Sequence, residues 1–299
     1  MSNFKGKRLI YERGCDALRK LTGRVNAGYI CPLCLNEFTQ LRALSREHVP
    51  PKSIGGKVIC LTCHDCNSTT GHQIDTHMHK ERLYHSFMEK NGQTRKAILI
   101  KDGNQLNVEV RNDEQGINIK ILGECNDPQV VNKLQLNVIL TGTDIQLRDR
   151  VSFNKMNADI GYLKSAYLAA FAKLGYVYIL RGELDRVRQQ IRAPQTKLLE
   201  LFRLEALSGD NAQKALFLFQ SPIRCLGVRI GNVIVCLPHP FDRDEFYEKI
   251  PDLRTAGGEA TWHSNDNCDW PEKFELALDF SDRYRIIEPH DAPAKSQPM

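Results

Sequence analysis

The chain has 299 residues, of which 41% are hydrophobic and 26% charged, and its formal net charge is +5. This length is at about the limit for one hydrophobic core, so we expect more than one compact unit. No apolar run approaches the roughly 20 residues of a membrane helix, and the polar start MSNFKGKRLI does not resemble a secretory signal. We therefore expect a soluble protein with a cytoplasmic location rather than a membrane or secreted protein.

Positive charge is concentrated near the N-terminus. Residues 1–90 hold 14 Lys and Arg against 8 Asp and Glu, a net +6, which leaves −1 for the rest. This distribution favours the N-terminal part as the phosphate-binding part of a nucleic-acid-binding protein. Residues 5–24 open it with apolar side chains among basic ones, which predicts one or two short helices that either pack on a neighbour or contact DNA.

Four of the ten cysteines form two Cys-x-x-Cys pairs, Cys31 with Cys34 and Cys63 with Cys66. Two such pairs are typical of a tetrahedral zinc site, and their presence in a long chain with scattered single cysteines indicates a reducing compartment. Cys60 offers a second register by pairing with Cys63. The Asn that follows Cys66 favours the later register.

The segment from Tyr29 to Gly71 is rich in turn signals and too poor in periodic apolar residues for long helices, so metal must supply part of its core. After Gly71 the spacing of apolar residues predicts a helix that stops at Asn91-Gly92. Three alternating runs at 97–123, separated by DGNQ and NDEQG, predict an antiparallel meander, which LQLNVIL and a strand near residue 145 extend.

The C-terminal region reads as mixed helices and strands. A helix is expected from Ala158 to Leu174 with one apolar stripe, followed by a buried strand at VYIL. Helices at 182–192 and 196–207, a hairpin across Gly231-Asn232 and a flexible tail from 288 complete this reading. We therefore expect two domains, 1–92 and 93–299, the second with a meander at 95–150, a mixed region at 151–287 and the tail at 288–299.

Three pieces converge in the N-terminal part: CPLC at 31–34, EHVPPKSIGG at 47–56 and CLTCHDCN at 60–67. Together they resemble the HNH endonuclease family, in the form whose ββα-metal finger is held by a four-cysteine zinc site. The resemblance covers roughly residues 29–80. It implies an α+β protein with a zinc-stapled finger at the N-terminus, followed by the meander and the mixed C-terminal region.

The resemblance also implies roles for three residues. By motif position, Glu47 and Asn67 would hold a catalytic cation, and His48 would act as the general base that activates water. Oxygen ligands suit Mg²⁺ or Mn²⁺, whereas the thiolates of Cys31, Cys34, Cys63 and Cys66 suit structural Zn²⁺. Two metals with separate tasks are therefore expected.

Several positions are less settled. Arg46 and Lys52 either contact backbone phosphates or are ordinary surface cations. Val58 stands where many family members have an Asn that braces the loop, and Glu47 replaces the more frequent Asp. His72 would lie about 140° around a helix from Asn67 and is a poor third ligand. Asp75 is about 12 Å along the same axis, so a hydrogen-bonding role is expected for it.

The sequence therefore predicts a metal-dependent endonuclease that cuts or nicks DNA, with RNA not excluded. The alternative is a zinc-dependent module that binds nucleic acid or protein without cutting. Residues 93–299 would sense a ligand, a protein partner or a particular nucleic acid and release the nuclease only then. Such an arrangement would suit an effector of antiviral defence in prokaryotes or phages.

Overall fold

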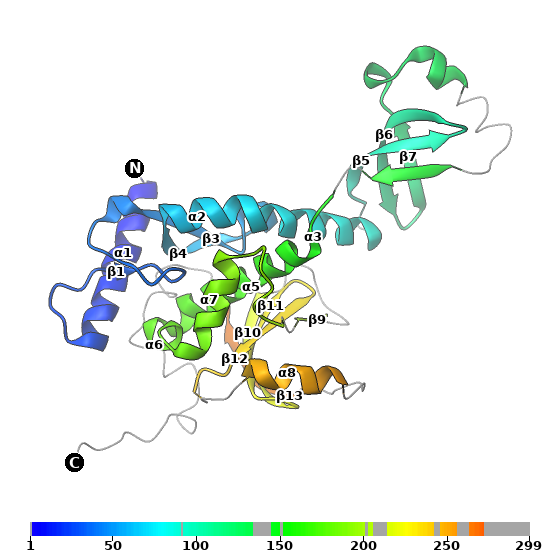
Figure 1. Cartoon of the computed structure of the whole chain (residues 1–299). Coiled ribbons are helices and arrows are strands. Elements are labelled where there is room, and N and C mark those ends of the chain that lie inside the picture. Colours follow the sequence, from blue (N-terminus) through cyan, green and yellow to red (C-terminus); the bar gives the residue numbers. More distant parts are fainter. Residues whose placement is uncertain are drawn as a thin grey trace. The chain divides into compact units, whose positions relative to one another are not determined.

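The computed structural model describes residues 2–90, 92–133, 145–149, 152–200, 203–205, 214–241, 246–255 and 263–271. It is an α+β protein with antiparallel sheets (Figure 1). The chain divides into two units, one made of Met1–Met78 with Met156–Met299 and the other of His79–Lys155. The expected boundary near residue 93 lies inside the second unit, and the C-terminal residues return to the first one. None of the described helices is long and apolar enough to cross a bilayer.

The first unit begins with helix α1 (Ser2–Thr22), as the sequence predicts for residues 5–24. It buries Ile10, Cys15 and Leu18, and the chain leaves the helix through Gly23, whose backbone adopts a positive φ of 71°. Two short antiparallel pairs follow: β1 (Tyr29–Ile30) with β2 (Glu37–Phe38), and β3 (Leu44–Val49) with β4 (Lys57–Cys63). Short 3-10 turns occupy Leu41–Ala43 and Lys52–Ile54.

A long helical run follows β4 directly. Helix α2 (His64–Thr70), a π-helical turn (Gly71–Asp75) and α3 (Thr76–Met88) follow one another without a break. The sequence prediction that this helix begins after Gly71 is therefore wrong. It begins earlier because the side chain of Cys63 accepts a hydrogen bond from the amide of Cys66 and so caps the first turn.

The second unit contains the predicted meander. Strands β5 (Thr94–Lys101), β6 (Asn104–Asp113) and β7 (Gly116–Ile121) pair antiparallel, and β8 (Gln146–Asp149) adds to the free edge of β5. Alternate residues of the sheet form a small core that includes Leu99, Leu106 and Val108. The segment LQLNVIL lies outside the described residues.

Helix α5 (Lys155–Leu174) is the centre of the first unit. The sequence predicts one apolar stripe, but sixteen of its twenty residues are buried. A helix buried on every side is a core helix rather than a surface helix. Its apolar residues belong to one hydrophobic cluster with residues of β1, β4 and the C-terminal sheet. The N-terminal finger and the C-terminal region therefore share a core.

After α5 the chain forms two shorter helices and a sheet. Helix α6 (Tyr176–Ile179) covers the first three residues of VYIL, so the strand predicted there is wrong. A 3-10 turn at Gly182–Leu184 and helix α7 (Asp185–Arg192) fit the prediction for 182–192. The helix predicted at 196–207 is also wrong: described residues 196–200 are not helical and 203–205 form a strand. Gln190 holds this extended segment, because its Oε1 accepts hydrogen bonds from the amides of Leu198 and Leu199.

The C-terminal sheet has the order β13-β10-β11-β12-β9. Its strands are β9 (Arg203–Glu205), β10 (Lys214–Ser221), β11 (Cys225–Ile230), β12 (Val233–Pro238) and β13 (His263–Asp269). The hairpin predicted across Gly231-Asn232 is confirmed, since Ile230 pairs with Val233. Helix α8 (Phe246–Thr255) buries Phe246 and Ile250. The predicted tail lies outside the described residues.

Candidate active site

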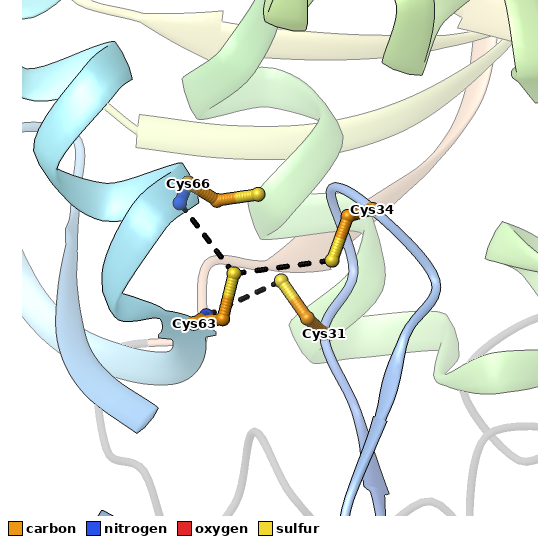
Figure 2. Close-up of side chains that lie close together, drawn as sticks. All are labelled: Cys31, Cys34, Cys63 and Cys66. Carbon is orange, nitrogen blue, oxygen red and sulfur yellow. Dashed lines mark hydrogen bonds between the residues drawn. The ribbon is translucent and has the colours of Figure 1, made fainter. Parts of the chain in front are cut away.

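Four cysteine side chains gather where the β1–β2 hairpin meets the start of α2. The Sγ atoms of Cys31, Cys34, Cys63 and Cys66 lie within 4.8 Å of one another, and Figure 2 shows them pointing into a common space. The Sγ atoms of Cys34 and Cys63 are 3.9 Å apart. Four sulfurs at about 2.3 Å from a tetrahedral zinc ion would lie about 3.8 Å apart, so the cluster fits that ion. Cys60 is buried outside the cluster.

The backbone and the neighbouring thiols prepare these sulfurs for a cation. The amide of Cys63 donates to the Sγ of Cys31 at 3.3 Å, and the amide of Cys66 donates to the Sγ of Cys63 at 3.4 Å (Figure 2). Hydrogen bonding, first of all from Cys31, lowers the pKa of Cys34 to about 2 and that of Cys63 to about 6, and the same bonds raise the pKa of Cys31. Thiols this crowded can all ionise only with a bound cation.

The second set of predicted residues meets beside this cluster. Glu47 on β3 and Asn67 on α2 are in contact, because the Nδ2 of Asn67 donates to the Oε2 of Glu47 at 3.0 Å. The hydroxyl of Thr62 on β4 donates to the same oxygen at 3.0 Å. Glu47 is only 4% exposed, and a carboxylate this deeply buried needs such donors. Strand pairing and the cap at Cys63 thus bring together two residues twenty positions apart.

The remaining oxygen of Glu47 has a partner that the sequence did not reveal. The Nζ of Lys164, on α5, lies 2.9 Å from the Oε1 of Glu47 and 2.8 Å from the Oδ2 of Asp75. Burial lowers the pKa of Lys164, but Glu47 and Asp75 outweigh it and the net shift is upward. Burial raises the pKa of Asp75, against the effect of Lys164. Asp75 therefore has the hydrogen-bonding role expected for it, with Lys164 as the partner.

His48 follows Glu47 on β3 and is half-buried. The β3–β4 pairing shifts between these two residues, so that Glu47 pairs with Cys60 and His48 with Val58. A bulge of this kind changes the direction of a side chain. Among the described residues the imidazole of His48 has no hydrogen-bond partner. Burial, followed by the charges of Arg46 and Lys52, lowers its pKa, which keeps the ring neutral at pH 7.

The loop after His48 is shaped by its glycines. Gly55 has a φ of 80°, and a Cβ on Gly56 would lie 1.4 Å from the carbonyl oxygen of Pro50. The positive φ favours glycine at position 55, and the close carbonyl leaves no room for a side chain at position 56, as the sequence predicts for this turn. The Nζ of Lys214 donates to the carbonyl of Gly55 at 2.9 Å and ties the loop to the C-terminal sheet.

The other basic residues of this segment fall into two groups, exposed cations and histidines. Arg46 and Lys52 are exposed, as a phosphate-contacting role requires. His64 has both ring nitrogens occupied, by the hydroxyl of Ser45 and the carbonyl of Arg42, each at 2.8 Å. His72 is exposed on the π turn and is not part of the Glu47 network.

Comparisons with known proteins found a match only for the segment that contains the cysteine cluster and Glu47. No curated protein and no solved structure matches the chain. A family model described as HNH endonuclease matches residues 31–83. This range contains both Cys-x-x-Cys pairs, Glu47, His48 and Asn67. The resemblance drawn from the motifs is confirmed: residues 31–83 match the HNH endonuclease family.

Proposed function

We propose that this protein is a metal-dependent endonuclease that hydrolyses phosphodiester bonds in DNA. One observation carries the proposal: Glu47 and Asn67 meet at 3.0 Å beside a neutral His48, within the segment that matches the HNH endonuclease model. Such a reaction needs a base for water and oxygen ligands for a hard cation. These three side chains supply both.

In this proposal each donor set has a different task. Thiolates prefer zinc, so the four cysteines would hold a structural zinc ion that ties the β1–β2 hairpin to α2. Glu47 and Asn67 would hold Mg²⁺ or Mn²⁺ through oxygen atoms. The Nδ2 of Asn67 is engaged with Glu47, which leaves its Oδ1 for the cation. The chemistry that this cation supplies when bound is neutralisation of charge on the phosphate and the leaving oxygen.

His48 accepts a proton from the attacking water in this scheme. Its ring is neutral at pH 7 because its pKa is lowered, and no hydrogen bond from the described residues occupies either nitrogen. Arg46 and Lys52, exposed on either side in sequence, would bind backbone phosphates and position the strand without reading its bases. Burial, and after it the charges of these two cations, lowers the pKa of the imidazole.

Nicking of supercoiled plasmid in Mg²⁺ and then in Mn²⁺ tests the proposal. Wild-type protein should nick, and chelation should stop it. His48→Ala and Asn67→Ala should each lose about 10² to 10⁴ in rate, because one removes the base and the other a cation ligand. His72→Ala, at an exposed histidine of the same segment, is the matched control and should nick as wild type does.

Two further measurements on the same samples separate cutting from binding. Zinc content and gel-shift affinity should stay at the wild-type level in His48→Ala, since neither the thiolates nor the surface cations change. A wild-type nicking rate in His48→Ala would contradict the mechanism. A protein that binds DNA but never nicks it would be the zinc-dependent binding module. A single-stranded RNA substrate in a parallel arm decides between DNA and RNA.

A further inference from the structure

Lys164 is the most deeply buried charged side chain near the proposed active site. Its side chain is 3% exposed, and its amine lies between the carboxylates of Glu47, at 5% exposure, and Asp75, at 17%. Burying a charge costs several kcal/mol unless partners compensate it. With the amine protonated and both carboxyl groups ionised, the three side chains carry a net charge of −1. The cluster is therefore partly balanced but not neutral.

The amine reaches the site because two helices approach closely. Gly161 lies one turn before Lys164 on α5, and a Cβ at Gly161 would come 2.8 Å from the Cβ of Met78 and 3.4 Å from the carbonyl oxygen of Ile74. A residue other than glycine would push the helices apart. One turn after Gly161, the hydroxyl of Ser165 contacts the sulfur of Met78 at 3.8 Å. This contact holds α5 against Met78 next to Lys164.

Asp75 holds the amine from the opposite side. It is the last residue of the π-helical turn Gly71–Asp75, whose wider winding changes the direction of the residues after Asn67. The Oδ2 of Asp75 accepts from Lys164, while its buried Oδ1 has no hydrogen-bond partner among the described residues. Asp75 is therefore placed for Lys164 and not for a wider polar network. The amine is held at two points and cannot swing away from Glu47.

The contacts of Glu47 divide between its two oxygens. Oε2 accepts from Thr62 and Asn67, and Oε1 accepts from Lys164. A carboxylate offers about four lone-pair positions, so three donors leave room for one more bond. Without Lys164, Oε1 would have no donor among these residues, and the carboxylate could rotate about its two bonds to Oε2. The amine therefore determines the orientation of the group.

We propose that Lys164 is a positioning residue of the active site, which α5 inserts to orient Glu47 as a ligand for the divalent cation. The proposal rests on the proposed function and adds to it a residue outside the segment that matches the HNH endonuclease model. The nuclease finger is then incomplete without α5. Partners that orient a metal ligand in this way typically change metal affinity or activity by about 10- to 100-fold when removed.

The test compares proteins of equal cluster charge. Lys164→Met alone would leave two buried carboxylates without a cation, and its instability would hide any effect on Glu47. The double variant Lys164→Met with Asp75→Asn keeps the net charge at −1, because one positive and one negative charge are lost together. Any remaining difference from wild type then reports the lost orientation of Glu47.

A matched control removes a partly buried cation that contacts α5 elsewhere. Arg203 pairs with Asp159 of α5 at 2.5 Å and lies over the ring of Tyr162 at 4.9 Å, and neither of these residues bonds to Glu47, Lys164 or Asp75. Arg203→Met therefore measures what loss of a partly buried ion pair on this helix costs. Its thermal stability should fall while its Mn²⁺ affinity stays at the wild-type level.

Mn²⁺ binding to the full-length protein, measured without nucleic acid by the electron paramagnetic resonance of free Mn²⁺, is the primary readout. The double variant should need about 10- to 100-fold more Mn²⁺ for half-saturation and for half-maximal nicking, with unchanged zinc content. Wild-type or tighter Mn²⁺ binding by the double variant overturns the inference alone. If wild-type protein neither binds Mn²⁺ nor nicks DNA, the proposed function fails and the inference fails with it.

Discussion

The four-cysteine cluster and the Glu47 site adjoin each other, yet they depend on different parts of the chain. All four thiols lie within residues 31–66, and the amides of Cys63 and Cys66 that support them are local. Glu47 instead needs Lys164, which is more than a hundred positions away in the sequence. The two proposed metal sites therefore differ in how they are formed: residues close together in the sequence form the cysteine cluster, whereas tertiary packing completes the proposed Glu47 site.

Helix α5 nevertheless contacts both sites. The hydroxyl of Tyr167 donates to the carbonyl of Pro32, between Cys31 and Cys34, at 2.6 Å. Lys164, almost one turn earlier, contacts Glu47. The difference between the sites is thus one of degree: α5 supports the backbone of the cysteine cluster, but it supplies a functional group to the carboxylate site.

The largest expected effect comes from removing one thiol. Cys63→Ser should release zinc and unfold the finger, because structural zinc contributes about 10 to 16 kcal/mol in isolated finger peptides. Elemental analysis and limited proteolysis of residues 29–80 would measure both. Cys60→Ser, at a buried cysteine outside the cluster, is the control and should keep about one zinc per chain. Zinc loss in the control instead would show that the other register holds the metal.

A smaller effect is expected at a hydroxyl that donates to Glu47. Thr62→Val keeps the shape of a fully buried side chain but removes the donor to Oε2. We expect about 10-fold weaker Mn²⁺ binding with zinc retained. Thr70→Val removes a buried hydroxyl that donates to the carbonyl of Cys66, and its Mn²⁺ affinity should not change. Equal losses in both variants would mean that general destabilisation, and not orientation of Glu47, controls the affinity.

The smallest effect tests the support that α5 gives to the cysteine cluster. Tyr167→Phe should lower the free energy of unfolding by about 1 to 2 kcal/mol, since it leaves the carbonyl of Pro32 without this donor. Tyr178→Phe removes a comparable buried bond, to the carbonyl of Pro238 at 2.8 Å. Both variants should lose stability in denaturant titrations, Tyr167→Phe more than Tyr178→Phe, because the Tyr167 hydroxyl also accepts from the Nη1 of Arg188. Only Tyr167→Phe should release zinc faster to a chelator. Equal release rates in the two variants would show that α5 does not support the cysteine cluster through this bond.

The sequence predicted the secondary structure correctly where the pattern that encodes it is local. Alternating residues and turn signals predicted the meander at 97–123, and the Gly231-Asn232 hairpin followed from its two-residue turn. VYIL was misread because a short apolar run fits a buried strand and a buried helical turn equally well. Only Tyr178 and Ile179 of this run are buried, whereas Leu180 is exposed. The hydroxyls of Tyr176 and Tyr178 bond to backbone carbonyls of distant segments, which no local pattern encodes.

The same limit applies to the proposed active site. Glu47, His48 and Asn67 were predicted from the family resemblance, and strand pairing helps to bring Glu47 and Asn67 into contact. Lys164 stands in a run of apolar residues on α5 and reads as a charge at the edge of an apolar stripe. One signal was present: a lysine inside a helix that is otherwise buried requires acidic partners. Their identity depends on which helix packs at Gly161, and that is a property of the fold.

Because the chain returns to the first unit after His79–Lys155, the first unit can be completed only late in synthesis. A ribosome releases the segment 31–83 well before it has added Lys164 and Tyr167. Domains emerge N-terminal first and generally fold as units. The core of this finger includes residues of α5, which is translated only after the second unit. Glu47 has no cation at its Oε1 during that interval. A nascent or prematurely terminated chain would carry Glu47, His48 and Asn67 and still lack Lys164, so in the proposed scheme the topology would delay cutting until translation has passed α5.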